Sequence, residues 1–104
     1  MQPFSVKAND LDIHGLKFGD GEEIVIALHG WLDNSASFAP MLTNVPSNQT
    51  WYCIDFAGHG LSSWRSTQAH YYFIDYVDDV YAFINVLNIK KVHLVGHSMG
   101  AMVA

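Results

Sequence analysis

The chain has 104 residues, of which 50% are hydrophobic, 14% are charged and 13% are aromatic. This length gives one domain rather than two, and the hydrophobic content excludes an intrinsically disordered chain. The net charge of -5, without a block of Lys or Arg, argues against a nucleic-acid partner. The longest aliphatic run, residues 24–28, is far shorter than the roughly 20 residues of a membrane helix. Because the chain opens without a secretory-signal pattern and has a single cysteine, Cys53, we expect a cytoplasmic protein.

Short β-rich segments alternate with helical patterns along the chain, which predicts an α/β domain with a mostly parallel sheet. We expect the first two strands to form an antiparallel hairpin. The third is continuously apolar, as in a strand buried on both faces. The five expected strands lie near residues 4–7, 12–18, 24–28, 51–56 and 92–95.

Two helices are expected between these strands, and a third begins at residues 101–104. The first lies near residues 35–44, with Asn34 or Ser35 as its N-cap. Its apolar stripe is predicted to be Phe38, Met41 and Leu42. The second covers about residues 72–88 and has apolar residues at steps of four, three, four and three. We interpret this stripe as core facing the sheet rather than as a binding face, and its members are Phe73, Val77, Val80, Ile84 and Leu87.

The segment Gly96-His97-Ser98-Met99-Gly100 matches the pattern G-x-S-x-G and follows the fifth strand directly. The pattern predicts a sharp strand-to-helix turn in which the serine has strained backbone geometry and neighbouring backbone leaves room only for glycine. Such a turn exposes the Ser98 hydroxyl and directs the first N–H groups of the next helix toward negative charge. A chance Gly/Ser turn is the alternative, but the strand before and the helix after favour the catalytic turn.

A second motif, His29-Gly30-Trp31, follows the third strand. Gly30 lets the chain turn away from the sheet, so that the N–H of Trp31 can point into the same site as the N–H of Met99. Two such donors form a hole for an oxyanion. The Trp31 indole either lines a substrate pocket or packs beneath the loop. The position of His29 at a strand end suits a hydrogen bond that braces the loop better than a catalytic role.

Other motifs in the sequence are weaker, and we expect neither a metal nor a cofactor. Gly58-x-Gly60 lacks the third glycine of a dinucleotide fingerprint and better fits tight turns near the active face. His93 and His97 are four residues apart, but on a strand and its turn this spacing does not bring side chains together. The sequence has no cysteine cluster and no H-E-x-x-H. Cys53 lies in an expected buried strand, where packing is its better role.

The chain resembles the α/β-hydrolase superfamily in three segments and in their order and spacing. These segments are residues 28–31, 55–62 and 94–100. Residues 29–38 are most similar to the serine hydrolase-like branch. The resemblance implies a three-layer α/β-hydrolase-type sheet whose third and fifth strands are neighbours. It also implies that Ser98 is the nucleophile in a turn built by Gly96, His97 and Gly100, and that Trp31 and Met99 donate to the oxyanion.

The implied reaction is attack by Ser98 on a carboxylic ester or related acyl compound, which forms an acyl-enzyme that water cleaves. In the family, the catalytic acid and then the histidine follow the serine in chain order. The chain ends six residues after Ser98, so no residue here takes either role. We therefore expect residues 1–104 to be the N-terminal portion of a single α/β-hydrolase domain, inactive as an isolated chain and with an open edge on its fifth strand.

The sequence leaves two other classes of function open. The chain could be a non-catalytic fragment, or a module that binds acyl compounds without turning them over. Alternatively, Ser98 could serve a carbon–carbon bond hydrolase or an acyltransferase of the same fold. The expected partner in each catalytic case is a small-molecule ester or acyl substrate.

Overall fold

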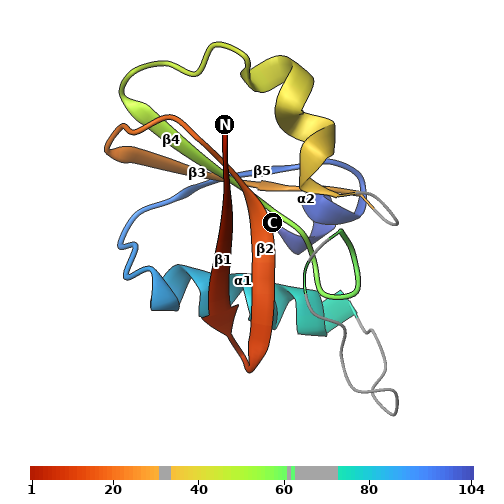
Figure 1. The fold of residues 1–104 in the computed structure, drawn as a ribbon. Helices are drawn as coiled ribbons and strands as arrows, with labels where there is room; N and C mark the ends of the chain where they lie inside the picture. Colours follow the sequence, from red (N-terminus) through yellow and green to blue (C-terminus); the bar gives the residue numbers. More distant parts are fainter. Residues whose placement is uncertain (31–33, 61, 63–72) are drawn as a thin grey trace.

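A computed structural model describes residues 1–30, 34–60, 62 and 73–104 of the chain. Five strands form one sheet in the order β1-β2-β4-β3-β5 (Figure 1). The elements are, in chain order, β1 (Gln2–Ala8), β2 (Leu11–Phe18), β3 (Glu23–Leu28), the 3₁₀ helix η1 (Ser35–Leu42), β4 (Gln49–Ile54), α1 (Phe73–Val86), β5 (His93–Gly96) and α2 (Met99–Val103).

The sheet is mixed. The strand β2 runs antiparallel to both β1 and β4, whereas β3 runs parallel to both β4 and β5. The predicted hairpin is therefore confirmed, and so is the predicted neighbourhood of the third and fifth strands. The hairpin turns at Asn9 and Asp10, whose φ angles are 51° and 59°. Positive φ at both central residues is the geometry that two-residue hairpin turns prefer.

Helices cover both faces of the sheet, which confirms the predicted three-layer α/β architecture. Figure 1 shows α1 on one side of the sheet and η1 on the other. Side chains alternate along β3, because Ile26 and Leu28 belong to the core on the α1 side and Ala27 belongs to the core under η1. All three are fully buried, as the continuous apolar run predicted.

The helix α1 forms where it was expected, and the described members of its predicted stripe pack on the core, although two aromatic residues outside the stripe are more deeply buried than most of it. Tyr76, Val80 and Phe83 are buried, whereas the predicted Val77 and Ile84 are only partly buried beside them. The Phe83 ring lies 5.7 Å from the ring of Phe4 on β1, measured between ring centroids. Aromatic rings from α1 and β1 thus pack together over the sheet.

The helix expected near residues 35–44 is the 3₁₀ helix η1. Its N-cap is Asn34, one of the two predicted residues, and the Asn34 side chain accepts a hydrogen bond from the N–H of Ala36 at 2.9 Å. Pro40 lies inside the helix and has no N–H to donate, which disfavours an α-helical ladder. Met41, predicted to belong to the apolar stripe, is instead 60% exposed.

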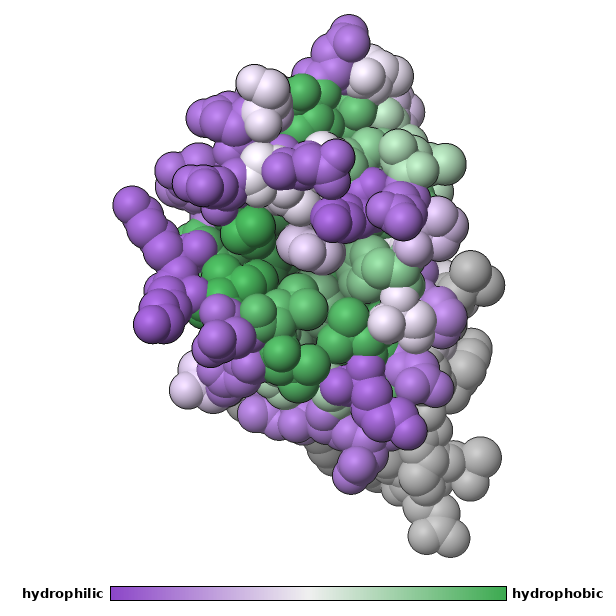
Figure 2. Space-filling model, turned by 60° about the vertical axis from the view of Figure 1, so that its left-hand side comes forward, coloured by the Kyte–Doolittle hydropathy of each residue, from purple (hydrophilic) through white to green (hydrophobic). Residues whose placement is uncertain are grey.

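Hydrophobic residues also reach the surface, and Figure 2 shows a group of them on one face between hydrophilic residues. The strand β5 lies at one end of the described sheet, with Leu94 38% exposed, in agreement with the predicted open edge. None of the described helices combines the length and the hydropathy needed to cross a membrane. The large exposed hydrophobic residues are Met1, Met41, Tyr81, Val86, Leu94 and Met102.

Candidate active site

Ser98 occupies a strained turn between β5 and α2. Its backbone has a φ of 56° and a ψ of -118°, a region that residues with a side chain rarely adopt. The Ser98 side chain is exposed and does not cap α2. The N–H of His97 donates to the carbonyl of Leu28 at 3.0 Å, which holds the turn against the end of β3. The serine hydroxyl is thus presented at the carboxyl edge of the sheet.

Close backbone contacts explain the glycines two residues before and two after the serine. A Cβ atom at Gly96 would lie 2.4 Å from the Cα of Ala101. A Cβ at Gly100 would lie 2.1 Å from the carbonyl oxygen of Leu28. Neither distance leaves room for a methyl group, so the turn has the geometry that the sequence pattern predicts.

The loop that follows β3 lies against this turn. A Cβ at Gly30 would lie 3.3 Å from the Cβ of Ser98 and 3.3 Å from Nδ1 of His97. Trp31, the predicted oxyanion donor on this loop, lies outside the described residues. Met99, the other predicted donor, is the first residue of α2, where N–H groups have no partner within the helix.

His29 is fully buried and connects two loops. Its Nδ1 atom lies 2.6 Å from the carbonyl oxygen of Gly30, and its Nε2 atom accepts from the N–H of Phe56 at 3.0 Å. The imidazole also stacks edge-on against the Phe56 ring, with 4.7 Å between centroids. These contacts confirm that His29 braces the loop.

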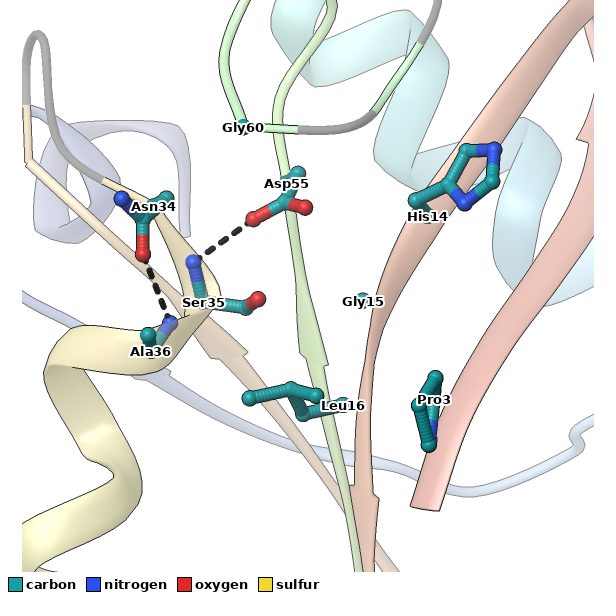
Figure 3. Close-up of a pocket in the computed structure, with 9 residues that line it drawn as sticks. All are labelled: Pro3, His14, Gly15, Leu16, Asn34, Ser35, Ala36, Asp55 and Gly60. Carbon is teal, nitrogen blue, oxygen red and sulfur yellow. Dashed lines mark hydrogen bonds between the residues drawn. The ribbon is translucent and has the colours of Figure 1, made fainter. Parts of the chain in front are cut away.

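Asp55 holds the start of η1, a role that sequence reasoning missed. The buried carboxylate accepts a hydrogen bond from the N–H of Ser35 at 2.7 Å, as Figure 3 shows. Gly60 has a φ of 50°, and a Cβ there would lie 2.4 Å from Cγ of Asp55. The Ser62 hydroxyl donates to the carbonyl of Asp55 at 2.5 Å and accepts from the N–H of His14 at 2.8 Å. The spacing of Asp, Gly and Ser in residues 55–62 is the signal for this tight turn.

A cavity of about 410 Å³ lies beside this loop, between β2 and the start of η1 (Figure 3). Ser98 does not line it, so the described cavity and the exposed serine are separate features. The cavity is lined by Pro3, His14, Gly15, Leu16, Asn34, Ser35, Ala36, Asp55 and Gly60.

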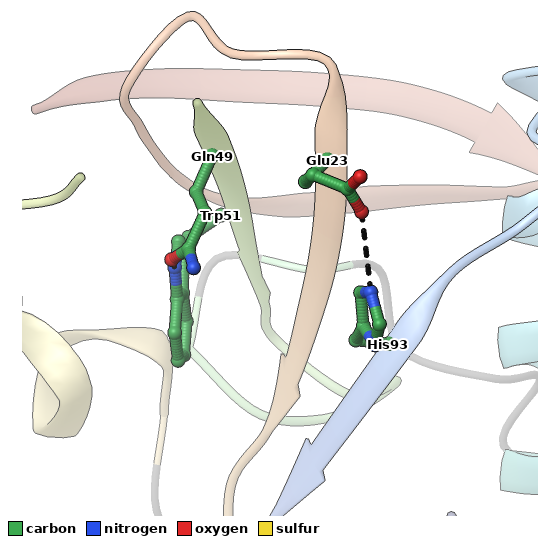
Figure 4. Close-up of polar contacts among 4 residues, drawn as sticks. All are labelled: Glu23, Gln49, Trp51 and His93. Carbon is green, nitrogen blue, oxygen red and sulfur yellow. Dashed lines mark hydrogen bonds and ion pairs between the residues drawn. The ribbon is translucent and has the colours of Figure 1, made fainter. Parts of the chain in front are cut away.

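The structure also separates the two histidines that are four residues apart in sequence. His93 at the start of β5 lies 3.3 Å from the carboxylate of Glu23, and both side chains are more than half exposed (Figure 4). His97 lies beside Gly30, at the other end of that strand. In the described ranges, no three His, Cys, Asp or Glu side chains are grouped as a metal site would require.

Cys53 is buried in the core beneath η1 and is unsuited to nucleophilic attack. Burial, with a smaller contribution from the charge of Asp55, raises the pKa of the Cys53 thiol to about 12. The reactive thiolate is therefore scarce in the folded protein at neutral pH.

We expect Cys53 in the folded protein to react with iodoacetamide at pH 8 about a thousand-fold more slowly than in the denatured chain, because thiolate is scarcer and access is blocked. The same raised pKa adds to the free energy of unfolding as long as the pH is below 9. This contribution declines as the pH rises from 9 toward 12, because the thiol of the unfolded chain then loses its proton first. Mass spectrometry of timed samples measures the labelling. Equal rates with and without denaturant would contradict the prediction.

Known proteins of the same fold resemble this chain in sequence. Residues 23–104 match the family model for the alpha/beta hydrolase fold. A serine hydrolase-like protein from Danio rerio is 44% identical over 80 residues, which are 77% of this chain and 24% of the relative. A 2-(acetamidomethylene)succinate hydrolase from Mesorhizobium japonicum is 36% identical over 78 residues, 75% of this chain and 27% of the relative.

A crystal structure of a hypothetical protein from Pseudomonas aeruginosa superimposes with a TM-score of 0.91 and 36% identity. The superposition covers 99% of this chain and 36% of that protein. The chain thus spans roughly a quarter to two-fifths of the length of the curated relatives that share the serine hydrolase-like name. From its sheet, its strained serine turn and the family match, the chain belongs to the α/β-hydrolase-fold family, in the branch of the serine hydrolase-like proteins.

Proposed function

We propose that the full-length gene product is a serine-dependent hydrolase that cleaves carboxylic esters or related acyl compounds through an acyl-enzyme on Ser98. The observation that carries this proposal is the conformation of Ser98. A strained φ of 56° is retained at an exposed serine that contributes no capping bond. Strain of this kind persists where a function needs the side chain in that place.

In the proposed reaction, Oγ of Ser98 attacks the acyl carbon while its proton passes to a base. The tetrahedral oxyanion is received by the N–H groups of Met99 and Trp31. The carbon–oxygen bond to the alcohol then breaks, and the alcohol leaves with the proton. Water hydrolyses the acyl-enzyme, releasing the acid and restoring the serine.

Gly96, His97 and Gly100 have a shaping role in this proposal, since they allow the turn that presents Ser98. A serine hydroxyl is a weak nucleophile without an adjacent base. We assign neither the base nor the acid to a residue of this chain. The isolated 104-residue chain is therefore proposed to be inactive.

An active-site phosphonate tests the proposal directly. We expect the full-length gene product to be labelled on Ser98, as located by mass spectrometry of the peptide, and the isolated chain to remain unlabelled. Labelling elsewhere in the full-length product, or none at all, would contradict the serine mechanism. Efficient labelling of the isolated chain would contradict the need for a base from outside residues 1–104. Binding of an acyl compound without labelling would favour the acyl-binding module.

The similarity to the 2-(acetamidomethylene)succinate hydrolase favours a second candidate. That relative is named for a succinate derivative that carries an acetamido group, so the same Ser98 could cleave a bond other than an ester bond. Relative kcat/KM values for p-nitrophenyl acyl esters and for substituted succinates decide between the two candidates.

A further inference from the structure

We propose that the cavity between β2 and the start of η1 is a binding site for a small organic ammonium ion. The cavity has a volume of about 410 Å³, and Ser98 does not line it. Cavities of about 300 to 1,000 Å³, with apolar walls and a few well-placed polar groups, are the usual sites of small molecules in proteins. This site is separate from the candidate active site and does not depend on the proposed function.

Apolar side chains line two sides of the cavity. On the sheet, Pro3 pairs with Leu16 across the β1–β2 hairpin, and both residues line the cavity on the face that η1 covers. Ala36, in the first turn of η1, lines the opposite side. These side chains favour a ligand with an apolar body, because contact with them removes apolar surface from water.

The hydroxyl of Ser35 is the first polar group that faces this apolar space. Ser35 is only 4% exposed, and Figure 3 shows its hydroxyl pointing from the start of η1 toward Leu16. In the part of the chain that the structure describes, this hydroxyl makes no hydrogen bond, although the N–H of the same residue donates to Asp55. A buried hydroxyl without a partner is unfavourable, so a ligand group that bonds to it gains affinity.

The carboxylate of Asp55 is the second polar group, and it gives the cavity a negative charge. Asp55 is also 4% exposed, and its Oδ1 atom accepts from the N–H of Ser35 at 2.7 Å, which holds the two residues side by side. Among the described lining residues there is no Lys or Arg. The ring of His14, the other titratable lining residue, points away from Asp55 in Figure 3.

An ammonium group matches this pair of oxygen acceptors. It carries three N–H donors and no acceptor, so it can bond to the Ser35 hydroxyl and to the Asp55 carboxylate at the same time. The bond to the carboxylate is between opposite charges, which makes it stronger than a bond from a neutral donor. A ligand carboxylate would instead be repelled by Asp55. The charge of the cavity therefore selects a cation, and its apolar walls select the organic part.

Three probes with the same aromatic ring test this selection on the wild-type full-length gene product. We expect 2-phenylethylammonium to bind with a Kd on the order of 1 mM, as is usual for so few atoms. The alcohol 2-phenylethanol should bind about 10-fold more weakly, and phenylacetate should not bind. NMR titration of the backbone amide signals near Ser35 and Gly60 measures the affinities. Equal affinity for the three probes, or signal changes centred on Ser98 instead, would overturn the proposal.

Two substitutions identify the groups that bind the ammonium ion. Asp55→Asn removes the charge but keeps an oxygen that can accept from Ser35, and we expect 2-phenylethylammonium to bind at least about 10-fold more weakly. Ser35→Ala removes the hydroxyl but keeps the N–H that donates to Asp55, and it should weaken binding about threefold. The matched controls are Asp20→Asn and Ser47→Ala, at exposed residues outside this cavity, and both should keep the wild-type affinity.

The experiment remains decisive if Asp55→Asn fails to fold, because Ser35→Ala and the three probes on the wild-type protein test the same site. Wild-type affinity for 2-phenylethylammonium in Ser35→Ala would overturn the proposal, and so would wild-type affinity in a folded Asp55→Asn. The variant Ser98→Ala is expected to bind 2-phenylethylammonium as the wild type does, whatever its turnover. Loss of binding in Ser98→Ala would assign the ligand to the serine turn and overturn the separate site.

Discussion

Replacing Ser98 by alanine is expected to lower turnover of an acyl substrate by about a million-fold in the full-length gene product. This expected loss of turnover is the one found for serine hydrolases without their nucleophile, because only substrate binding and the oxyanion hole then accelerate the reaction. Steady-state ester hydrolysis, corrected for the uncatalysed rate, measures the effect. The control is Ser47→Ala at an exposed loop serine away from the turn, which should change turnover less than twofold. Substantial turnover by Ser98→Ala would contradict the proposed mechanism.

A second variant, Ser98→Gly, tests the backbone strain at this position. Glycine adopts a φ of 56° with a ψ of -118° without the strain that a serine bears there. We therefore expect Ser98→Gly to raise the free energy of unfolding by about 1 kcal/mol while turnover is lost. Urea denaturation monitored by circular dichroism measures the first effect. A variant less stable than wild type would show that the serine conformation is not strained.

Replacing Gly100 by alanine is expected to destabilise the fold by at least about 3 kcal/mol and to remove activity. The added Cβ would lie 2.1 Å from the carbonyl oxygen of Leu28 and 2.7 Å from that of His29, so backbone must move. Backbone atoms cannot move aside as a flexible side chain can. The expected loss in free energy of unfolding is therefore at the upper end of the range for substitutions that overpack a protein core.

Urea denaturation and acyl-substrate hydrolysis test the Gly100 prediction together. The control is Met102→Ala in the same helix, because that side chain is 73% exposed and its removal should change the free energy of unfolding by less than about 0.5 kcal/mol. Gly30→Ala offers a graded comparison, since its nearest contacts would be 3.3 Å and involve side-chain atoms. Wild-type stability in Gly100→Ala would contradict the close approach of α2 to β3.

Much of this protein could be predicted from local patterns in the sequence. The uninterrupted apolar residues of β3 predict a central strand, because only a strand covered on both faces buries all of them. Asn34 predicts the start of η1, because its side chain can satisfy an N–H that the helix leaves without a partner. The glycines around Ser98 predict the strained turn, because only glycine fits against backbone at those positions. Each of these predictions depends on residues close together in the chain.

Other features were decided only by the tertiary structure. The sheet places β4 between β2 and β3, so that its pairing is antiparallel on one side and parallel on the other. The core beneath α1 contains Tyr76 and Phe83 beside the predicted Val80, although neither aromatic residue belongs to the predicted stripe.

The contacts around the candidate site were also decided only by the tertiary structure. Asp55 accepts from Ser35, 20 residues earlier in the chain, and His29 accepts from Phe56, 27 residues later. No local periodicity records such pairs, because they form only when the carboxyl ends of adjacent strands bring their loops together. By itself, the sequence determined which strands and turns form and that Ser98 is the residue to present. Only the tertiary structure decided which side chains hold the surrounding loops, because the partners come from separate segments that meet only in the folded sheet.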